Sequence, residues 1–236
     1  MTDIPEARPA STVVLLRDTD NGMETLMLKR NKALMFAGGL WVFPGGALEN
    51  SDIESAEGDI ALAARIAAAR EAEEECGLRP DTDNMVHLSH WTTPVVEPKR
   101  FETWIYAAPL AEDADVAIDG SEIHDFAWIR VRDAVAQHEA GEFGMLPPTY
   151  ITLLSLLRYT TTADMAAGEN EIPPPYVFPV FTKADGKMAV LFQGDAGYET
   201  GDGSAEGARH RAIMQEKGWE YVYRNVDDTY LPFVRS

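Results

Sequence analysis

The stretch "REAEEECGL", Arg70 to Leu78, places four glutamates within five residues. The segment before it, from Asp59 onward, is rich in alanine, leucine and arginine, which favour a helix, and Gly77 is well placed to cap that helix. The C-terminus of a helix carries partial negative charge, and like charges three or four residues apart destabilise it by roughly 0.2–0.5 kcal/mol per pair. The glutamates therefore oppose helix formation, and their presence needs another explanation.

Helical spacing predicts that Glu71, Glu74 and Glu75 share one face, whereas Glu73 turns about 100° or more away from it. Three convergent carboxylates with no His or Cys beside them suit a hard, oxygen-seeking cation such as Mg²⁺ or Mn²⁺. Arg70 lies four residues before Glu74 and is expected to hold that carboxylate by a charge-assisted hydrogen bond. The competing interpretation is a solvated last turn, with Arg70 in an ordinary surface ion pair.

The chain carries 39 Asp and Glu against 20 Lys and Arg, a formal net charge of −19 over 236 residues. This balance disfavours nucleic acid as a partner, and an anionic substrate would need a metal ion or local arginines. The apolar runs are far shorter than the roughly 20 residues of a membrane helix, and we expect neither a membrane span nor a secretory signal. The single cysteine, Cys76, fits a cytoplasmic protein without internal disulfides.

Alternating and periodic apolar patterns predict a mixed α/β domain followed by a polar, proline-rich linker and a β-rich extension. The predicted strands of the first part are 11–18, 23–30, 40–46, 85–94, 100–110 and 124–131, and its predicted helices are 59–76, 133–141 and 147–159. The predicted strands of the extension are 176–182, 187–193, 209–215 and 219–226. The predicted boundaries are 8–160 for the first domain, 161–176 for the linker and 177–236 for the extension, which we expect to cover a sheet edge or form a homodimer contact.

The stretch "REAEEECGL" resembles the Nudix box, G-x5-E-x7-R-E-U-x-E-E-x-G-U, where U is a bulky aliphatic residue. The matching residues are Arg70, Glu71, Glu74, Glu75, Gly77 and Leu78. Upstream, "FPGG" from Phe43 to Gly46 resembles the strand and loop that lead into the box. The resemblance implies a Nudix-type α/β/α sandwich with a mixed β-sheet, plus the β-rich C-terminal extension.

The sequence departs from the box in two places. Gly46 lies 24 positions before Arg70 instead of 14, so the loop carries an insertion of about ten residues near 47–57. The usual glutamate eight residues before the arginine falls on Leu62. Its role is either vacant or taken by one of three insert residues, Glu49, Glu54 or Glu57.

The resemblance implies Mg²⁺- or Mn²⁺-dependent hydrolysis of the pyrophosphate bond in a nucleoside diphosphate linked to another moiety. The stretches "WVFPGG", "WTTPVVEPKRFETWIY" and "GMLPPTYITLL" resemble the branch that contains the peroxisomal coenzyme A diphosphatase, which suggests coenzyme A or acyl-coenzyme A as substrate. ADP-ribose and NADH are alternative substrates. A second hypothesis is a module that binds a nucleotide metabolite without hydrolysing it, which the missing glutamate at Leu62 favours.

The resemblance also implies residue roles. The metal ligands are expected to be Glu71, Glu74, Glu75 and the carbonyl of Gly45. Glu75 is the first choice for general base and Glu122 the second, with Arg70 as the remaining catalytic residue. The expected substrate contacts are Lys29, Arg30, Phe43, Gly46, Arg100 and Phe101.

Overall fold

The apolar run at residues 13–16 lies in the central strand of the fold and is buried on both sides. Val13 and Leu15 face one hydrophobic core, and Val14 and Leu16 face another. A strand covered on both faces needs apolar residues at successive positions, whereas a half-exposed strand alternates apolar and polar residues. The run therefore accounts for a sheet that has helices on both faces.

The computed structural model describes residues 5–34, 37–97, 99–118 and 120–234. The strands of the large sheet are β1 (Arg8–Thr19), β2 (Gly22–Arg30), β3 (Trp41–Val42), β4 (Gly45–Ala47), β5 (Val86–Thr92), β6 (Phe101–Pro109), β7 (Ile123–Arg130) and β8 (Tyr176–Val177). The helices are α1 (Asn50–Ser55), α2 (Ile60–Cys76), α3 (Val131–Ala140), α4 (Pro147–Leu156) and α5 (Thr162–Asn170). The described helices include none that is long and apolar enough to cross a membrane.

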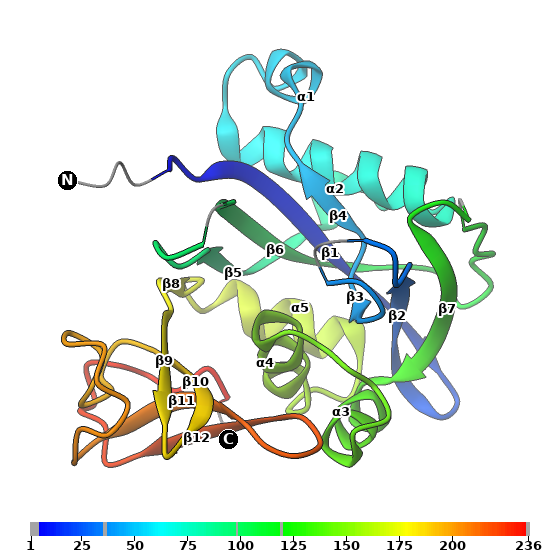
Figure 1. Ribbon diagram of the computed structural model, residues 1–236. Helices are drawn as coiled ribbons and strands as arrows, with labels where there is room; N and C mark the ends of the chain where they lie inside the picture. The colour runs from blue at the N-terminus through cyan, green and yellow to red at the C-terminus, as the bar shows by residue number, and fades with distance from the viewer. Residues whose placement is uncertain (1–4, 35–36, 98, 119, 235–236) are drawn as a thin grey trace.

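The large sheet is mixed, and its strands follow the order β3-β2-β1-β6-β5-β8, with β4 also paired to β1 and β7 to β2. β1 runs parallel to β6 and antiparallel to β2 and β4. Helix α2 lies across one face of this sheet, and α3, α4 and α5 lie on the other (Figure 1). The predicted α/β sandwich with a mixed sheet is confirmed.

Helix α2 has the ends that the sequence predicts. Asp59 caps its N-terminus by accepting hydrogen bonds from the backbone N–H groups of Ala61 and Leu62. Gly77 ends it in the left-handed conformation at φ 73°, which glycine adopts at little cost. Small buried side chains, including Ala64 and Ala68, let the helix backbone approach the sheet closely. The acidic end of α2 is thereby held firmly against the sheet.

The C-terminal strands form a separate antiparallel sheet in the order β12-β11-β10-β9 (Figure 1). These strands are β9 (Val180–Ala184), β10 (Lys187–Leu191), β11 (Arg209–Met214) and β12 (Trp219–Arg224). Arg211 on β11 forms a fully buried, bidentate ion pair with Asp195, whose carboxylate also accepts the N–H of His210. The backbone N–H of Trp219 donates to His138 of α3, which joins this sheet to the helices of the first part.

The segment 161–176, predicted as a linker, contains helix α5. Thr161 caps the helix by accepting a hydrogen bond from the N–H of Asp164, and Met165 is fully buried. Thr162 donates to the carboxylate of Asp18 at the far end of β1. The burial of Met165, the cap by Thr161 and the hydrogen bond to Asp18 hold the segment on the sheet, although its composition is polar. Residues 162–170 of the predicted linker therefore form a helix, which the sequence pattern did not predict.

Candidate active site

Glu75, in the last turn of α2, is held against the backbone at the first residue of β4. Its Oε2 accepts a hydrogen bond from the N–H of Gly45 at 3.1 Å, and the residue is only 8% exposed. Burial, more than any neighbouring charge, raises the pKa of Glu75 from 4.5 to about 8. A carboxylate with this pKa is able to take up a proton near neutral pH, which is the property of a general base.

Arg30 and Glu122 lie next to Glu75. The end of β2 pairs with the start of β7, which aligns Arg30 with Ile123 and brings the preceding Glu122 alongside. Arg30 forms an ion pair with Glu122 at 3.0 Å, and its guanidinium lies 3.9 Å from Oε1 of Glu75. The structure therefore brings together the first and second choices for general base, with a predicted phosphate contact between them.

Glu71 lies one turn before Glu75 and packs directly on the second glycine of the "FPGG" stretch. Burial is the main cause that raises the pKa of Glu71, and its carboxylate in turn helps to raise the pKa of Glu75. A Cβ atom added to Gly46 would come within 2.4 Å of Oε1 of Glu71, and one added to Gly45 within 2.4 Å of the carbonyl of Ser11. Only glycine allows β4 to approach both the helix and β1 this closely.

We expect Gly46→Ala to lower kcat at least about tenfold because its methyl group must displace the Glu71 carboxylate. Circular dichroism melting and steady-state kinetics are the measurements. Gly58→Ala is a control for the loss of a glycine, since a Cβ there meets nothing within 4 Å, although its φ of 87° adds backbone strain. Unchanged kinetics in Gly46→Ala would show that the position of Glu71 does not matter.

Arg70 makes its principal contact with a residue that sequence reasoning missed. Its Nε and Nη2 donate to the two carboxylate oxygens of Asp52 at 3.2 and 3.0 Å, and Nη2 also donates to the carbonyl of Ala47. Asp52 belongs to α1, in the insertion, and is 2% exposed. The hydrogen bonds that Arg70 donates to Asp52 are the largest cause of a raised pKa for Arg70. Asp52 therefore fastens the insertion to α2.

The three glutamates proposed to replace the residue at Leu62 take other places. Glu49 is the N-cap of α1, and Glu54 and Glu57 are exposed, with no hydrogen bond to Arg70 among the described residues. Leu62 itself lies in the first turn of α2 and is 40% exposed. The spacing Glu49-x-x-Asp52 is a capping box and could have identified α1 and its inward acidic residue from the sequence.

Glu74 is bound to Arg70 as its spacing predicts, with Nη1 of Arg70 3.2 Å from Oε2, and it is largely exposed. Nη1 of Arg70 also donates to Glu71 at 3.0 Å. Within the described ranges, no three His, Cys, Asp or Glu side chains stand ready to hold a metal ion. The donor chemistry nevertheless fits a divalent cation, because burial opposes the ionisation of both Glu71 and Glu75, and the charge of Glu71 opposes that of Glu75 further.

Four predicted substrate contacts lie apart from this group. Lys29 is on the opposite face of β2 from Arg30, with its ammonium over the ring of Trp41. Phe43 is buried in the core below β3 and supports the strand. Arg100, at the start of β6, donates to the backbone carbonyls of Thr93 and Pro5, and the N–H of Phe101 donates to the hydroxyl of Thr93. Arg100 and Phe101 therefore organise the β5–β6 turn.

A mixed sheet between helices, with an acidic helix end packed on a glycine pair, is the arrangement that the resemblance to the Nudix box predicts. The family described as the NUDIX domain matches residues 7–148, and the chain belongs to this family. It is similar to a Caenorhabditis elegans protein named nudix hydrolase 7, with 25% identity over 227 residues that cover 81% of this chain and 74% of that protein. The crystal structure of a NUDIX hydrolase from Alicyclobacillus acidocaldarius has the same fold, with a TM-score of 0.63 at 22% identity, covering 70% of this chain and 97% of that one.

Proposed function

We propose that the protein is a Mg²⁺- or Mn²⁺-dependent diphosphatase that cleaves the pyrophosphate bond of coenzyme A or acyl-coenzyme A. The observation that carries the hydrolytic part is the group around Glu75: a buried carboxylate with a pKa near 8, beside Glu71 and within reach of Arg30. The coenzyme A part is supported by the resemblance of the stretches around Trp41, Trp91 and Pro147 to the coenzyme A diphosphatase branch.

Each residue of the site has a separate role in the proposed hydrolysis. Glu71, Glu74, Glu75 and the carbonyl of Gly45 would hold the cation, which supplies neutralisation of the phosphate oxygens and activation of the attacking water. Glu75 accepts the proton of the water, and Glu122 is the alternative acceptor. Arg30 binds phosphate oxygens, for which its guanidinium is suited.

Asp52 and Arg70 set the geometry of this machinery. Arg70 lies between the carboxylates of Glu71 and Glu74 and reaches both through Nη1. Asp52 holds the other edge of the guanidinium, so that Arg70 is fixed at both edges. The insertion thus supports the catalytic helix with an acidic residue from outside it.

The test is a substrate panel of coenzyme A, acyl-coenzyme A, ADP-ribose and NADH, with products identified by mass spectrometry in ¹⁸O water. We expect 3′,5′-ADP and a 4′-phosphopantetheine fragment, with ¹⁸O on one of the two phosphates. Free coenzyme A with a labelled fatty acid would show a thioesterase instead. Faster cleavage of ADP-ribose or NADH would move the substrate assignment to those nucleotides. Binding without turnover at saturating Mg²⁺ would favour the sensing module.

We expect Mg²⁺ or Mn²⁺ to raise the melting temperature of the metal-free protein. The carboxylates of Glu71 and Glu75 lie at the negative end of α2, so a bound cation relieves their repulsion as well as adding binding energy to the folded state. Differential scanning fluorimetry over a titration up to about 10 mM measures the shift, with K⁺ at equal ionic strength as the control. Equal melting temperatures across the titration would contradict the metal site.

A further inference from the structure

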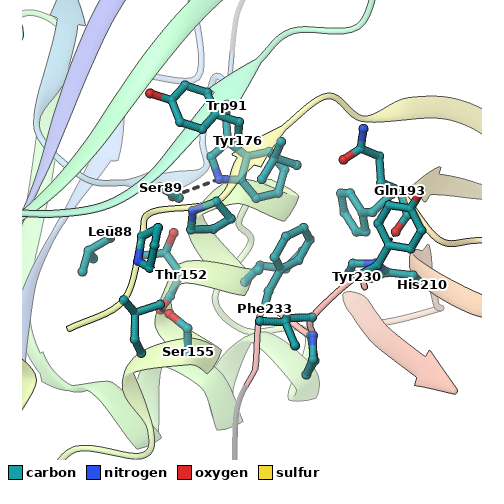
Figure 2. A pocket seen from close by; sticks show the side chains of 18 of the residues that line it. Leu88, Ser89, Trp91, Thr152, Ser155, Tyr176, Gln193, His210, Tyr230 and Phe233 are labelled. Atoms are coloured by element: carbon teal, nitrogen blue, oxygen red, sulfur yellow. Dashed lines mark hydrogen bonds between the residues drawn. The ribbon is translucent and has the colours of Figure 1, made fainter. Parts of the chain in front are cut away.

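A cavity of about 300 Å³ lies between the first part of the chain and the C-terminal sheet (Figure 2). Its walls come from β5, helix α4, strand β11 and the tail at 229–233. Trp91 on β5 lines it and belongs to the core on the α4 side of the large sheet, whereas α2 packs on the opposite face. The cavity is therefore separate from the candidate active site.

The lining of the cavity is strongly aromatic. The rings around it include Trp91, Tyr176, Phe192, His210, Tyr230 and Phe233. Four of the lining residues, Tyr176, Phe178, Tyr230 and Leu231, are also 40–59% exposed, although they are large and apolar. Apolar side chains that gather at a cavity and stay exposed mark a binding site more often than a packing defect.

His210 lines the cavity and carries a hydrogen-bond acceptor that is covered by its neighbours. It is 2% exposed, and its Nδ1 lies 2.7 Å from the carbonyl of Gln193. Because a carbonyl only accepts, Nδ1 carries the proton and Nε2 is left as an acceptor in the neutral ring. Burial lowers the pKa of His210, which favours this neutral form. Nε2 is buried and has no hydrogen-bond partner among the described residues.

Arg158, after α4, lines the same cavity. Its Nη2 is paired with Glu169, and its Nε is buried without a hydrogen-bond partner in the described parts of the chain. The ion pair with Glu169 compensates the charge of the guanidinium, so this wall does not favour an anion. Two residues of the lining therefore each carry an unpartnered polar atom, an acceptor in His210 and a donor in Arg158, that neighbouring side chains cover.

We propose that this cavity binds an uncharged, planar heteroaromatic molecule that carries both a hydrogen-bond donor and an acceptor. Its ring packs among Trp91, Tyr176 and Phe233, where offset and edge-on ring contacts are favourable. Its donor serves Nε2 of His210 and its acceptor serves Nε of Arg158, with small movements of the rings that cover these atoms. Pairing both atoms recovers the cost of burying them unsatisfied, which an aliphatic ligand cannot do.

Adenine is a suitable probe because it is planar and uncharged and has both a donor and an acceptor. The full chain labelled with ¹⁵N-tryptophan gives indole N–H signals, and Trp91→Phe assigns the signal of Trp91. We expect adenine to shift the Trp91 signal saturably, with a Kd below about 5 mM, and to leave the signal of Trp128, which does not line the cavity, unchanged. An unmoved Trp91 signal overturns the proposal, and so does saturation by n-octanol in place of adenine.

Three variants test the location and the polar contact. Ser155→Phe fills the cavity and is expected to weaken adenine binding at least about tenfold. His210→Phe keeps a ring but removes the acceptor and is expected to weaken binding several-fold. His124→Phe, at an exposed histidine of β7, is the matched control and should bind within twofold of the wild type. Adenine affinity at the wild-type level in a folded Ser155→Phe protein overturns the proposal. If that variant does not fold, the shift of the Trp91 signal in the wild-type protein on addition of adenine remains the test.

Discussion

Glu75→Gln is expected to lower kcat at least about 100-fold with the fold intact. Glutamine has the same shape, and its amide oxygen accepts the N–H of Gly45 as the carboxylate does, so the packing of α2 on β4 is preserved. The variant loses the negative charge and the basic oxygen, which together are worth several kcal/mol in a charge-neutralising and proton-accepting position. Steady-state kinetics with coenzyme A and Mg²⁺ measures the loss.

Glu73→Gln is the matched control, because Glu73 lies two residues away on the same helix, is half exposed and pairs with Arg79. Its kcat should stay within about twofold of the wild type, as is typical for an exposed ion pair. Wild-type activity in a purified, folded Glu75→Gln protein would remove Glu75 from the mechanism.

Glu75→Gln should also change how the stability of the protein depends on pH. In the metal-free wild type, an unfolded Glu75 ionises above pH 4.5, whereas the folded residue keeps its proton until about pH 8. The unfolded state therefore binds fewer protons in this window, and stability falls as the pH rises through it. Glutamine does not ionise, so the melting temperature of Glu75→Gln should exceed that of the wild type increasingly from pH 5 to pH 8. If the melting temperatures of the two proteins differed by the same amount at every pH, the raised pKa of Glu75 would be contradicted.

Asp52→Asn is expected to destabilise the protein by about 2–4 kcal/mol and to lower kcat at least about tenfold. The change leaves Arg70 without the buried charge that it contacts through two hydrogen bonds, and losing one partner of a buried ion pair has a cost of this order. Arg70 then loses its fixed orientation toward Glu71 and Glu74. Urea unfolding gives the stability change, and kinetics in Mg²⁺ gives the second effect.

Glu54→Gln in the same short helix is the control, because Glu54 is exposed and should change neither quantity measurably. The double variant Asp52→Asn/Leu62→Glu removes the carboxylate of Asp52 and places another at the position where the Nudix box usually has its glutamate. Leu62 lies eight residues before Arg70 on the same helix, about 12 Å along its axis. Restored activity in the double variant would show that a carboxylate in the first turn of α2 can replace Asp52, and that the position of Asp52 in the insertion is not required.

Much of this architecture follows from local patterns. The caps Asp59 and Gly77 and the helix-forming composition between them locate α2, and apolar alternation locates most strands. These features depend on neighbours along the chain, which the sequence displays directly.

The remaining features depend on contacts across the chain. Asp52 meets Arg70 only because α1 folds back onto α2. Helix α5 is likewise held by contacts with distant parts of the chain, which are the burial of Met165, the hydrogen bond from Thr162 to Asp18 and the ion pair of Glu169 with Arg158. The placement of Lys29 was available from the sequence, because adjacent residues of a strand point to opposite faces and Arg30 takes the face of Glu75. The alternation of side chains along β2 therefore places Arg30, and not Lys29, beside Glu75.

The parallel pairing of β1 with β6 has a consequence for the order of folding. It joins residues 8–16 with residues 101–109, so the central strand lacks one neighbour until more than one hundred residues have been synthesised. Antiparallel pairing with β2 and β4 and the packing of α2 need only the first 76 residues. Contacts of such long range slow folding, and an unpaired strand edge invites association with other chains. We therefore expect the glycine pair and the acidic helix end to come together early during translation, and the closing of the sheet by β6 to limit the rate at which a functional enzyme appears.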